Sequence, residues 1–239
     1  MALPKINSNL TYDTTVPSTK EKIKYRPFLV GEEKLFLIAT QSDSPRVLYD
    51  TVKRVVSQCV LTENFDVDTL TEFDLEYIFI LLRSKSVGEK EDLLIACESC
   101  EERNTVTIDF EKSAYIKNLN QQLDNRIDFG RGISVTLKGF DASKALDLAE
   151  SEMSEVDQVF HVIDSMIDRV YTEEEVMVFA DESYDERYAF IDSMTAVQLQ
   201  KIQKYIQSLP KVAMDISFVC GNCGTHNKRV LEGISNFFT

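Results

Sequence analysis

The sequence predicts an α+β fold that is mainly helical and contains one small β element, whose two parts bracket a large insert. Two observations predict this arrangement. Several segments carry apolar residues at helical spacing. The stretch LIACESC, which ends at Cys100, has a counterpart in SFVCGNC, which ends at Cys223, and both are strand-like runs that stop in Cys-x-x-Cys. More than a hundred residues separate them, so we expect the intervening chain to be an insert between two halves of one element.

The first part of the chain, residues 1–21, is expected to be an extended arm, because it has turn-forming residues and no apolar periodicity. Residues 22–90 are expected to form a strand followed by helices. KIKYRPFLV alternates as a strand does, and Pro27 places it at a sheet edge or ends its pairing. GEEKLFLIATQ indicates a short helix with acidic residues near its N-terminus.

Two longer helices are predicted next. SPRVLYDTVKRVVSQCV begins with Ser44 and has Pro45 in the favoured first turn. Its apolar stripe ends at Cys59, which we expect to be a buried thiol and not a ligand. In TEFDLEYIFILLRSK, Thr71 and Asp74 form a capping-box-like pair, and the centre is apolar nearly all round. Such a helix is expected in a core.

Residues 113–213 are expected to form an acidic, mostly helical insert with one hairpin. The glycines of RIDFGRGISVTLKGF separate two short runs, which predicts the hairpin. VDQVFHVIDSMIDRVYT carries apolar residues at helical spacing throughout, with His161 beside the stripe and no second ligand one turn further on. A strand-like VMVFA follows. FIDSMTAVQLQKIQKYIQSLPK predicts a helix that is capped by Thr195 and ended by Pro210.

Composition and charge narrow the class of protein. The chain has 239 residues, a formal net charge of −14, 44% hydrophobic and 28% charged residues, which is the composition of a folded globular protein. Its N-terminus is polar and unlike a signal peptide. Its longest apolar runs are too short to span a bilayer, so we expect a cytoplasmic protein without a membrane partner. The acidic balance argues against broad binding to nucleic-acid backbones.

Acidic residues are concentrated in 141–186, where fifteen Asp and Glu stand against only Lys144 and Arg169 as bases. Two interpretations stay open at this point. The acids could be solvated faces of helices, or they could form an acidic surface that meets a basic partner.

The sequence shows no residue constellation typical of an active site. FDVDTLT resembles the Asp-x-Asp-x-Thr loop of haloacid-dehalogenase-type phosphotransferases, but Leu70 stands where that pattern has threonine. The residues before it are also too polar for the buried strand that this chemistry needs. Asp66 and Asp68 are therefore expected to serve a turn and a helix cap. We expect no catalytic residues and no enzyme.

Four of the five cysteines have the clearest predicted chemistry. LIACESCEERNTVTIDF and SFVCGNCGTHNKRVLEG share a strand, Cys-x-x-Cys, four further positions to an asparagine, and another strand. Each stretch is typical of one half of a zinc ribbon, in which two knuckles complete a tetrahedral site of four sulfurs. Residues 91–112 and 214–239 are thus predicted to form a split ribbon that holds a structural Zn²⁺. The predicted ligands are Cys97, Cys100, Cys220 and Cys223.

Other uses of the cysteines match the sequence less well. A redox Cys-x-x-Cys caps a helix after a strand and needs no second pair, and disulfides are rare in a reducing cytoplasm. His226 is an alternative fourth ligand, and the first knuckle lacks the glycines of the second. Some ribbons bind nucleic acid, so a zinc-ribbon nucleic-acid-binding or transcription-related factor is the alternative function. The bases near the knuckles are few, namely Arg103, Lys228 and Arg229.

Several segments in a fixed order resemble a known family. They are KIKYRPFLVGEEKLFLIA, FDLEYIFILLRSKSVGE, the two cysteine knuckles, FIDSMTAVQLQKIQKYIQSLPK and the closing LEGISNFF. In this order they resemble the T4-like phage baseplate hub proteins, the hub subunits and hub-assembly factors of contractile-tailed phages. The resemblance implies a non-enzymatic protein that helps to build the central hub of a tail baseplate, either as a transient chaperone or as a component of the hub.

The resemblance also implies where the protein acts and with what. Its partners would be other baseplate hub proteins, and its location the host cytoplasm during assembly or the virion tail baseplate. Within Lys24–Ala39, the residues Tyr25, Arg26 and Phe28 are of types enriched at interfaces, so we single them out as candidate partner contacts. An equally good interpretation is that Tyr25 and Phe28 pack the N-terminal strand onto the core.

Overall fold

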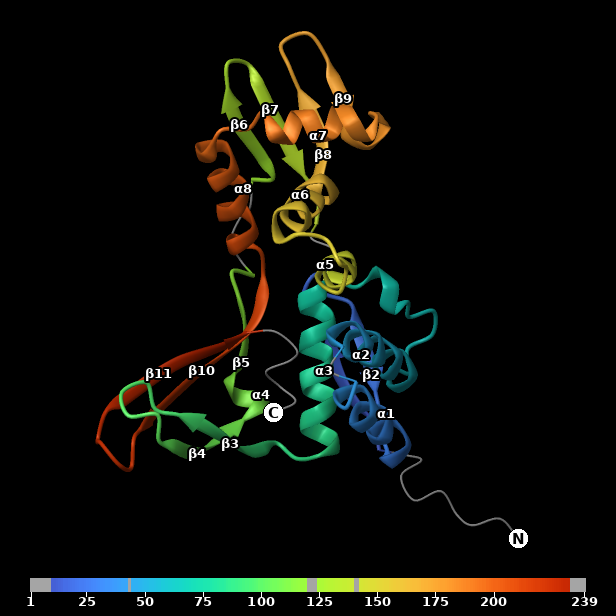
Figure 1. The fold of residues 1–239 in the computed structure, drawn as a ribbon. Helices are drawn as coiled ribbons and strands as arrows, with labels where there is room; N and C mark the ends of the chain where they lie inside the picture. Colours follow the sequence, from blue (N-terminus) through green and yellow to red (C-terminus); the bar gives the residue numbers. More distant parts are fainter. Residues whose placement is uncertain (1–9, 43, 120–123, 140–141, 233–239) are drawn as a thin grey trace. The chain divides into compact units, whose positions relative to one another are not determined.

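The computed structural model describes residues 10–42, 44–119, 124–139 and 142–232 (Figure 1). The chain divides into two compact units. Unit 1 contains Met1–Leu119 and Pro210–Thr239, and unit 2 contains Asn120–Leu209. In sequence, unit 2 therefore lies between the two parts of unit 1.

The prediction of a mainly helical fold is wrong. The structure is α+β with 42% helix and 29% strand, and its strands form four small antiparallel sheets. Local periodicity gives little signal for strands whose partners are distant in sequence. The strand β5 (Ala114–Lys117), for example, pairs with β10 (Lys211–Val219), which follows the whole of unit 2. Such strands are stabilised by pairing that a short sequence window does not contain.

Unit 1 begins with a hairpin and three helices. The hairpin joins β1 (Tyr12–Thr15), which lies within the expected arm, to β2 (Lys22–Tyr25). The helices are α1 (Val30–Thr40), α2 (Pro45–Cys59) and α3 (Glu72–Ser86), and the 3₁₀ turn η1 (Val67–Thr69) precedes the last of them. The predicted cap of α2 is confirmed, because the Ser44 side chain accepts a hydrogen bond from the backbone N–H of Val47. Cys59 is fully buried at the end of α2, as predicted.

Helix α3 is the central core element of unit 1. The predicted pair at its N-terminus is confirmed, since Thr71 and Asp74 form a capping box. The helix is apolar nearly all round because it packs against two clusters of buried side chains. Leu75 and Phe79 belong to the cluster of α1, α2 and the first hairpin, whereas Ile80 belongs to the cluster of the cysteine-bearing hairpins. The prediction of a core helix is therefore confirmed.

Two antiparallel hairpins carry the cysteine pairs, and both belong to unit 1. The first joins β3 (Lys90–Ala96) to β4 (Arg103–Asp109), and the second joins β10 to β11 (His226–Glu232). A short helix, α4 (Phe110–Ser113), connects β4 to β5, which extends the second hairpin to a sheet of order β11-β10-β5. Alternating apolar residues of both hairpins enter one cluster and hold the hairpins against each other.

Among its described residues, unit 2 has a four-stranded sheet, four α-helices and one 3₁₀ turn. Its sheet has the order β6-β7-β8-β9 and contains the predicted hairpin. The strands are β6 (Arg126–Gly130), β7 (Ile133–Leu137), β8 (Ile167–Tyr171) and β9 (Val176–Val178). The helical elements are α5 (Ala142–Ala149), α6 (Glu155–Met166), η2 (Phe179–Asp181), α7 (Tyr184–Asp192) and α8 (Ala196–Ser208). Helix α8 has the predicted cap, because the Thr195 side chain accepts a hydrogen bond from the Gln198 backbone N–H.

One helix of unit 2 is shorter than its apolar spacing predicts. The spacing continues to Val170, but α6 ends at Met166 and the chain enters β8 at Ile167. Ile167 and Val170 are buried in the strand, where Val170 pairs with Val135 of β7 and with Met177 of β9. Apolar residues three positions apart fit one face of a helix, but they also fit a twisted strand with a bulge. Because β8 pairs with a strand on each side, the segment forms a strand here.

In the part of the chain that the structure describes, no helix has both the length and the apolar character needed to cross a membrane.

Candidate metal centre

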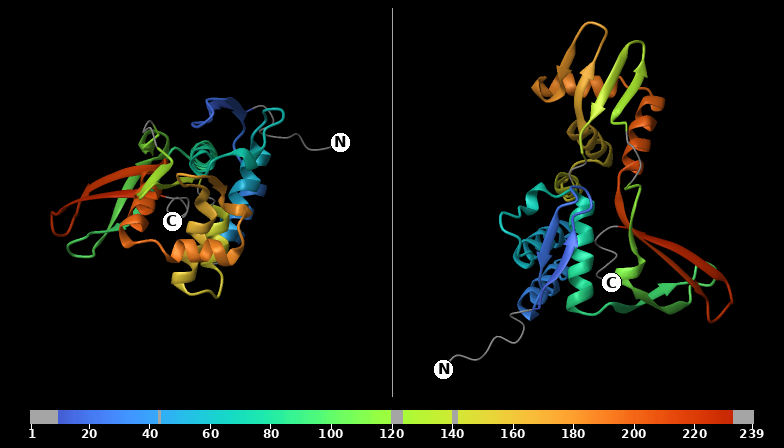
Figure 2. Two further views of the ribbon diagram at one scale, coloured as in Figure 1. Left: turned by 90° about the horizontal axis from the view of Figure 1, so that it is seen from above. Right: turned by 180° about the vertical axis from the view of Figure 1, so that it is seen from behind.

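The two cysteine-bearing hairpins bring the four predicted ligands together. Cys97 and Cys220 each follow the first strand of their hairpin, and Cys100 and Cys223 lie in the turns that follow. Figure 2 shows the two hairpins side by side. All four sulfur atoms lie within 4.8 Å of one another, so the cysteines cluster at metal-binding distance.

The distances between the sulfur atoms fit a tetrahedral ion. The Sγ atoms of Cys97 and Cys223 are 3.7 Å apart, and those of Cys100 and Cys220 are 3.6 Å apart. A tetrahedral ion with metal–sulfur bonds of about 2.3 Å places its sulfur ligands about 3.8 Å from each other. A disulfide would need about 2.05 Å, and all five cysteines are free thiols. The cluster is therefore compatible with a metal site of four thiolates.

The backbone makes the same turn in both knuckles. The N–H of Cys97 donates to the carbonyl of Glu102 at 2.8 Å, and the N–H of Cys220 donates to the carbonyl of Thr225 at 2.9 Å. These pairs occupy equivalent positions, since each acceptor lies two residues after the second cysteine of its knuckle. The two halves of the site are thus repeats of one local structure.

One position in this turn requires a left-handed backbone. In the second knuckle it is Gly224, with φ of 73°, and in the first it is Glu101, with φ of 59°. Glycine adopts this conformation without steric cost, whereas a residue with a side chain does so at some expense. The absence of glycine from the first knuckle therefore does not change its turn but leaves it strained at one residue.

Asn227 of the second hairpin holds the first knuckle. Its side chain is buried, and its Nδ2 donates to the Sγ of Cys97 at 3.4 Å. Its Oδ1 accepts a hydrogen bond from the backbone N–H of Glu98 at 2.9 Å. One amide therefore fixes both the sulfur and the backbone of a knuckle that lies more than a hundred residues away in sequence.

Asn104 of the first hairpin makes the equivalent contacts with the second knuckle. Its Nδ2 donates to the Sγ of Cys220 at 3.6 Å, and its Oδ1 accepts from the backbone N–H of Gly221 at 2.9 Å. The two hairpins thus exchange asparagines in a pseudo-twofold arrangement. Sequence comparison of the two stretches locates these asparagines at equal offsets, but it does not show that each one serves the opposite knuckle.

The cysteines differ in how readily they lose a proton. A hydrogen bond from the backbone N–H of Ser99 is the largest effect that lowers the pKa of Cys97, to about 6. The backbone N–H of Cys223 likewise lowers the pKa of Cys220. For Cys100, an amide hydrogen bond lowers the pKa, but the neighbouring sulfurs and burial outweigh it and raise the pKa to about 11. In each knuckle, the pKa of the first cysteine is thus lowered, which favours the thiolate form that binds a metal ion.

The remaining cysteine and the alternative ligand lie outside the cluster. Burial raises the pKa of the Cys59 thiol to about 11, as expected for an apolar environment. His226 is exposed at the start of β11 and is not part of the sulfur cluster. Of the bases near the knuckles, Arg229 forms an ion pair with Glu98, with Nε and Oε1 3.4 Å apart.

The candidate partner contacts Tyr25, Arg26 and Phe28 lie where β2 leads to α1. Tyr25 is 2% exposed and Phe28 is 7% exposed, and both belong to a core cluster of unit 1. The Arg26 guanidinium pairs with Glu32, with Nη2 and Oε1 2.7 Å apart. A partner contact at these three residues stays a prediction. Within the same segment, α1 exposes the apolar side chains of Val30, Leu37 and Ile38.

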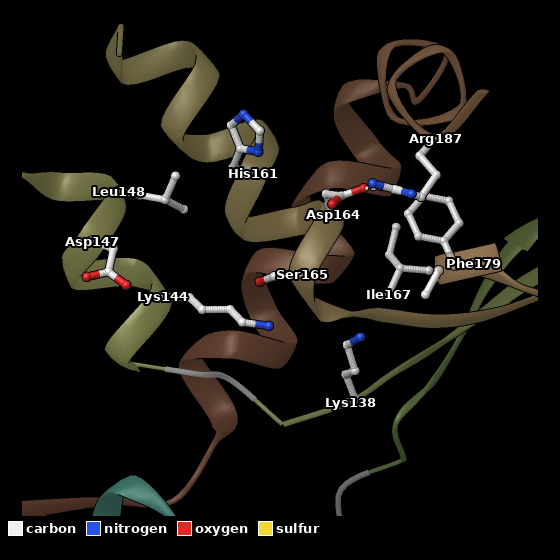
Figure 3. A pocket seen from close by; sticks show the side chains of 11 residues that line it. Lys138, Lys144, Asp147, Leu148, His161, Asp164, Ser165, Ile167, Phe179 and Arg187 are labelled. Carbon is white, nitrogen blue, oxygen red and sulfur yellow. Dashed lines mark hydrogen bonds and ion pairs between the residues drawn. The ribbon is translucent and has the colours of Figure 1, made fainter. Parts of the chain in front are cut away.

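A separate cavity of about 440 Å³ lies within unit 2. Figure 3 shows Lys138 and Lys144 extending into the same space, with Arg187 and Asp164 on its wall. Arg187 donates from Nε to Asp164 Oδ1 at 2.7 Å and also to the backbone carbonyl of Glu182. The guanidinium is therefore engaged within the protein, and it fixes α7 to α6.

The fold and the site define an α+β protein with a ribbon-type centre of four cysteines, whose two halves come from distant parts of the chain. Comparison with known families then identifies it: residues 9–239 match the family described as T4 bacteriophage base plate protein, and the chain belongs to this family. Membership indicates a role in the phage baseplate and interaction with other phage structural proteins. No curated protein and no solved structure was found to match.

Proposed function

We propose that the protein acts in the assembly of the central hub of the tail baseplate, as a transient chaperone or as a component of the hub. The observation that supports a baseplate role is the family match, which spans nearly the whole chain. The finer assignment to the hub rests on the ordered segments that resemble hub proteins, from KIKYRPFLVGEEKLFLIA to LEGISNFF. We infer that the protein works by protein–protein interaction and not as an enzyme.

We further propose that the four-cysteine cluster holds a structural Zn²⁺. A site with four sulfur ligands favours zinc or iron, and sulfur–sulfur distances of 3.6 and 3.7 Å support a single tetrahedral ion. Bound there, Zn²⁺ would stabilise the thiolates and join the two hairpins. Four protein ligands leave no open coordination position for a substrate, so the ion supports the fold and not a reaction.

The position of the ligands in the chain gives this ion a particular structural role. Cys97 and Cys100 precede unit 2, and Cys220 and Cys223 follow it. We propose that the metal ties together the two chain segments that lead into and out of the acidic insert. The ribbon would then keep unit 1 intact although its parts are separated in sequence by the whole of unit 2.

The test of the proposed function is quantitative mass spectrometry of the protein in tail-assembly intermediates and in purified mature particles. A fixed copy number in both is the result expected of a hub component. Presence in the intermediates and loss from the particles is the result expected of a chaperone. Absence from both would overturn the assignment to hub assembly.

A further inference from the structure

A small aromatic hollow lies on unit 2, between α6 and α7, and none of the functions above uses it. Its lining includes the buried side chain of Ile191 and aromatic rings from both helices. We call this feature the aromatic hollow and define it by its lining residues: Met153, Asp157, Phe160, His161, Asp164, Tyr184, Tyr188 and Ile191.

The rings of the hollow pack on one another and leave their outer surfaces accessible. Phe160 and Tyr188 are stacked with ring centroids 4.9 Å apart, and Tyr184 lies 6.1 Å from Tyr188. His161 stacks on Tyr184 with centroids 6.1 Å apart. Yet Tyr184 remains 52% exposed and Tyr188 38% exposed. Tyrosines at positions i and i+4 of α7 thus present accessible aromatic surface on one side of the helix.

The size of the hollow restricts what can occupy it. Its volume is about 50 Å³, whereas pockets for cofactors and other small molecules usually measure about 300–1,000 Å³. A space of this size accommodates the end of one side chain. Aromatic faces attract a guanidinium or ammonium group because the ring quadrupole is negative above the ring plane.

The charges around the hollow favour a cation as the occupant. Asp157 lies in its wall, where Oδ2 accepts a hydrogen bond from the Ser154 hydroxyl at 2.7 Å, and a carboxylate has acceptor sites for further donors. Six of the hollow's eight lining residues also belong to the stretch 141–186, which contains fifteen acidic residues and two bases. A second copy of this chain, with its net charge of −14, would be repelled, whereas a basic partner would be attracted over a distance.

We propose that the aromatic hollow binds an arginine or lysine side chain from a basic segment of another baseplate protein. The cation would lie against the faces of Tyr184 and Tyr188 and pair with the carboxylate of Asp157. This inference rests on the proposed function in hub assembly, for which it names the surface and the chemistry of the partner. It also decides between the two interpretations of the acidic stretch, since one part of that stretch then serves recognition.

The test is a calorimetric or fluorescence titration of the full-length protein with a capped tetra-arginine peptide at low ionic strength. Saturable binding is expected for the wild type. Tyr184→Leu and Tyr188→Leu keep apolar bulk but remove the aromatic face, so each is expected to weaken binding about threefold to tenfold. Tyr184→Phe keeps the ring and is expected to bind as the wild type does. Circular dichroism confirms that each variant is folded.

Two charge variants distinguish a direct contact in the aromatic hollow from the long-range electrostatic attraction exerted by the negative charge of the whole protein. Asp157→Asn removes the carboxylate in the hollow and keeps an oxygen for the Ser154 hydroxyl. Glu174→Gln removes an exposed charge from the β8–β9 turn, outside the hollow. The proposal expects a larger loss for Asp157→Asn. Equal losses in these two variants, or equal binding by Tyr184→Leu and Tyr184→Phe, would overturn it.

This titration can fail without the proposed function failing. If the peptide binds equally to all variants while the protein is found in tail-assembly intermediates, only the role of the hollow is lost. If the protein is absent from intermediates and particles, the proposed function is lost whatever the peptide does.

Discussion

Replacing Asn227 with leucine tests whether the asparagine exchange prepares the metal centre. The variant keeps the volume of a buried side chain but removes the donor 3.4 Å from the Cys97 sulfur and the acceptor 2.9 Å from the Glu98 N–H. A hydrogen bond to a charged group contributes about 1.5–3 kcal/mol. Loss of a group that supports metal ligands weakens metal affinity about 10-fold to 100-fold, which corresponds to about 1.4–2.7 kcal/mol. We therefore expect the zinc dissociation constant to rise by one to two powers of ten.

Competition with a calibrated zinc chelator measures this constant, and the absorption of the Co²⁺-substituted protein reports the geometry of the thiolates. Two further asparagines give a graded comparison. Asn104→Leu removes a half-buried donor 3.6 Å from its sulfur and is expected to have a smaller effect. Asn222→Leu removes an exposed donor at 3.8 Å and is expected to change affinity least. Wild-type affinity in the folded Asn227→Leu variant, or equal losses at all three positions, would refute the reasoning.

Three further predictions concern the stability of unit 1, each measured by urea or thermal unfolding. Asp74→Asn should lower the free energy of unfolding by about 3 kcal/mol, because the fully buried side chain of Asp74 accepts hydrogen bonds from Ser18 and from Thr71. The matched change Asp66→Asn, at an exposed helix cap, should leave the free energy of unfolding almost unchanged. Similar losses in the two variants would contradict this prediction. Glu101→Gly should stabilise the protein by about 0.5 kcal/mol. Glycine relieves the strain of a left-handed φ of 59°, but part of this gain is lost because glycine also increases the conformational entropy of the unfolded chain. A destabilised variant would show that the backbone at this position is not strained. Hydrogen bonds from Lys211 and Lys117 lower the pKa of Glu232 below its ordinary value of 4.5, so the wild type should lose stability as the pH falls from 4.5 through this lower pKa. The variant Glu232→Gln should lose less stability over the same pH range. Identical stability–pH profiles for the two proteins would contradict a stabilising role of these ion pairs.

The sequence predicts elements well where the signal is local. Ser44, Thr71 and Thr195 each begin a helix as expected, because a cap and its hydrogen-bond partner lie within one turn of the chain. The hairpin of β6 and β7 is also predicted from its glycines. The strand content is underestimated for the opposite reason. The strand β5 is short, for example, and its pairing partner β10 follows the whole of unit 2, so the neighbouring sequence does not contain the signal for this pairing.

The candidate site is predictable to the level of its ligands and no further. Two Cys-x-x-Cys stretches with equal flanking patterns predict that Cys97, Cys100, Cys220 and Cys223 come together, and the structure places them so. The cross-over of Asn104 and Asn227 depends on how two hairpins face each other, which no local pattern contains. The aromatic hollow was also missed, although the spacing of Tyr184 and Tyr188 is a signal that places both rings on one face of a helix.

The central claim is that a four-thiolate zinc site joins the two parts of unit 1. Its most direct test is the metal content of the protein, purified without added metal and measured by inductively coupled plasma mass spectrometry. We predict one zinc per chain in the wild type, and loss of both the metal and solubility in Cys97→Ser and in Cys223→Ser. Full retention of zinc in both variants, or a folded wild-type protein that contains no metal, would contradict the account.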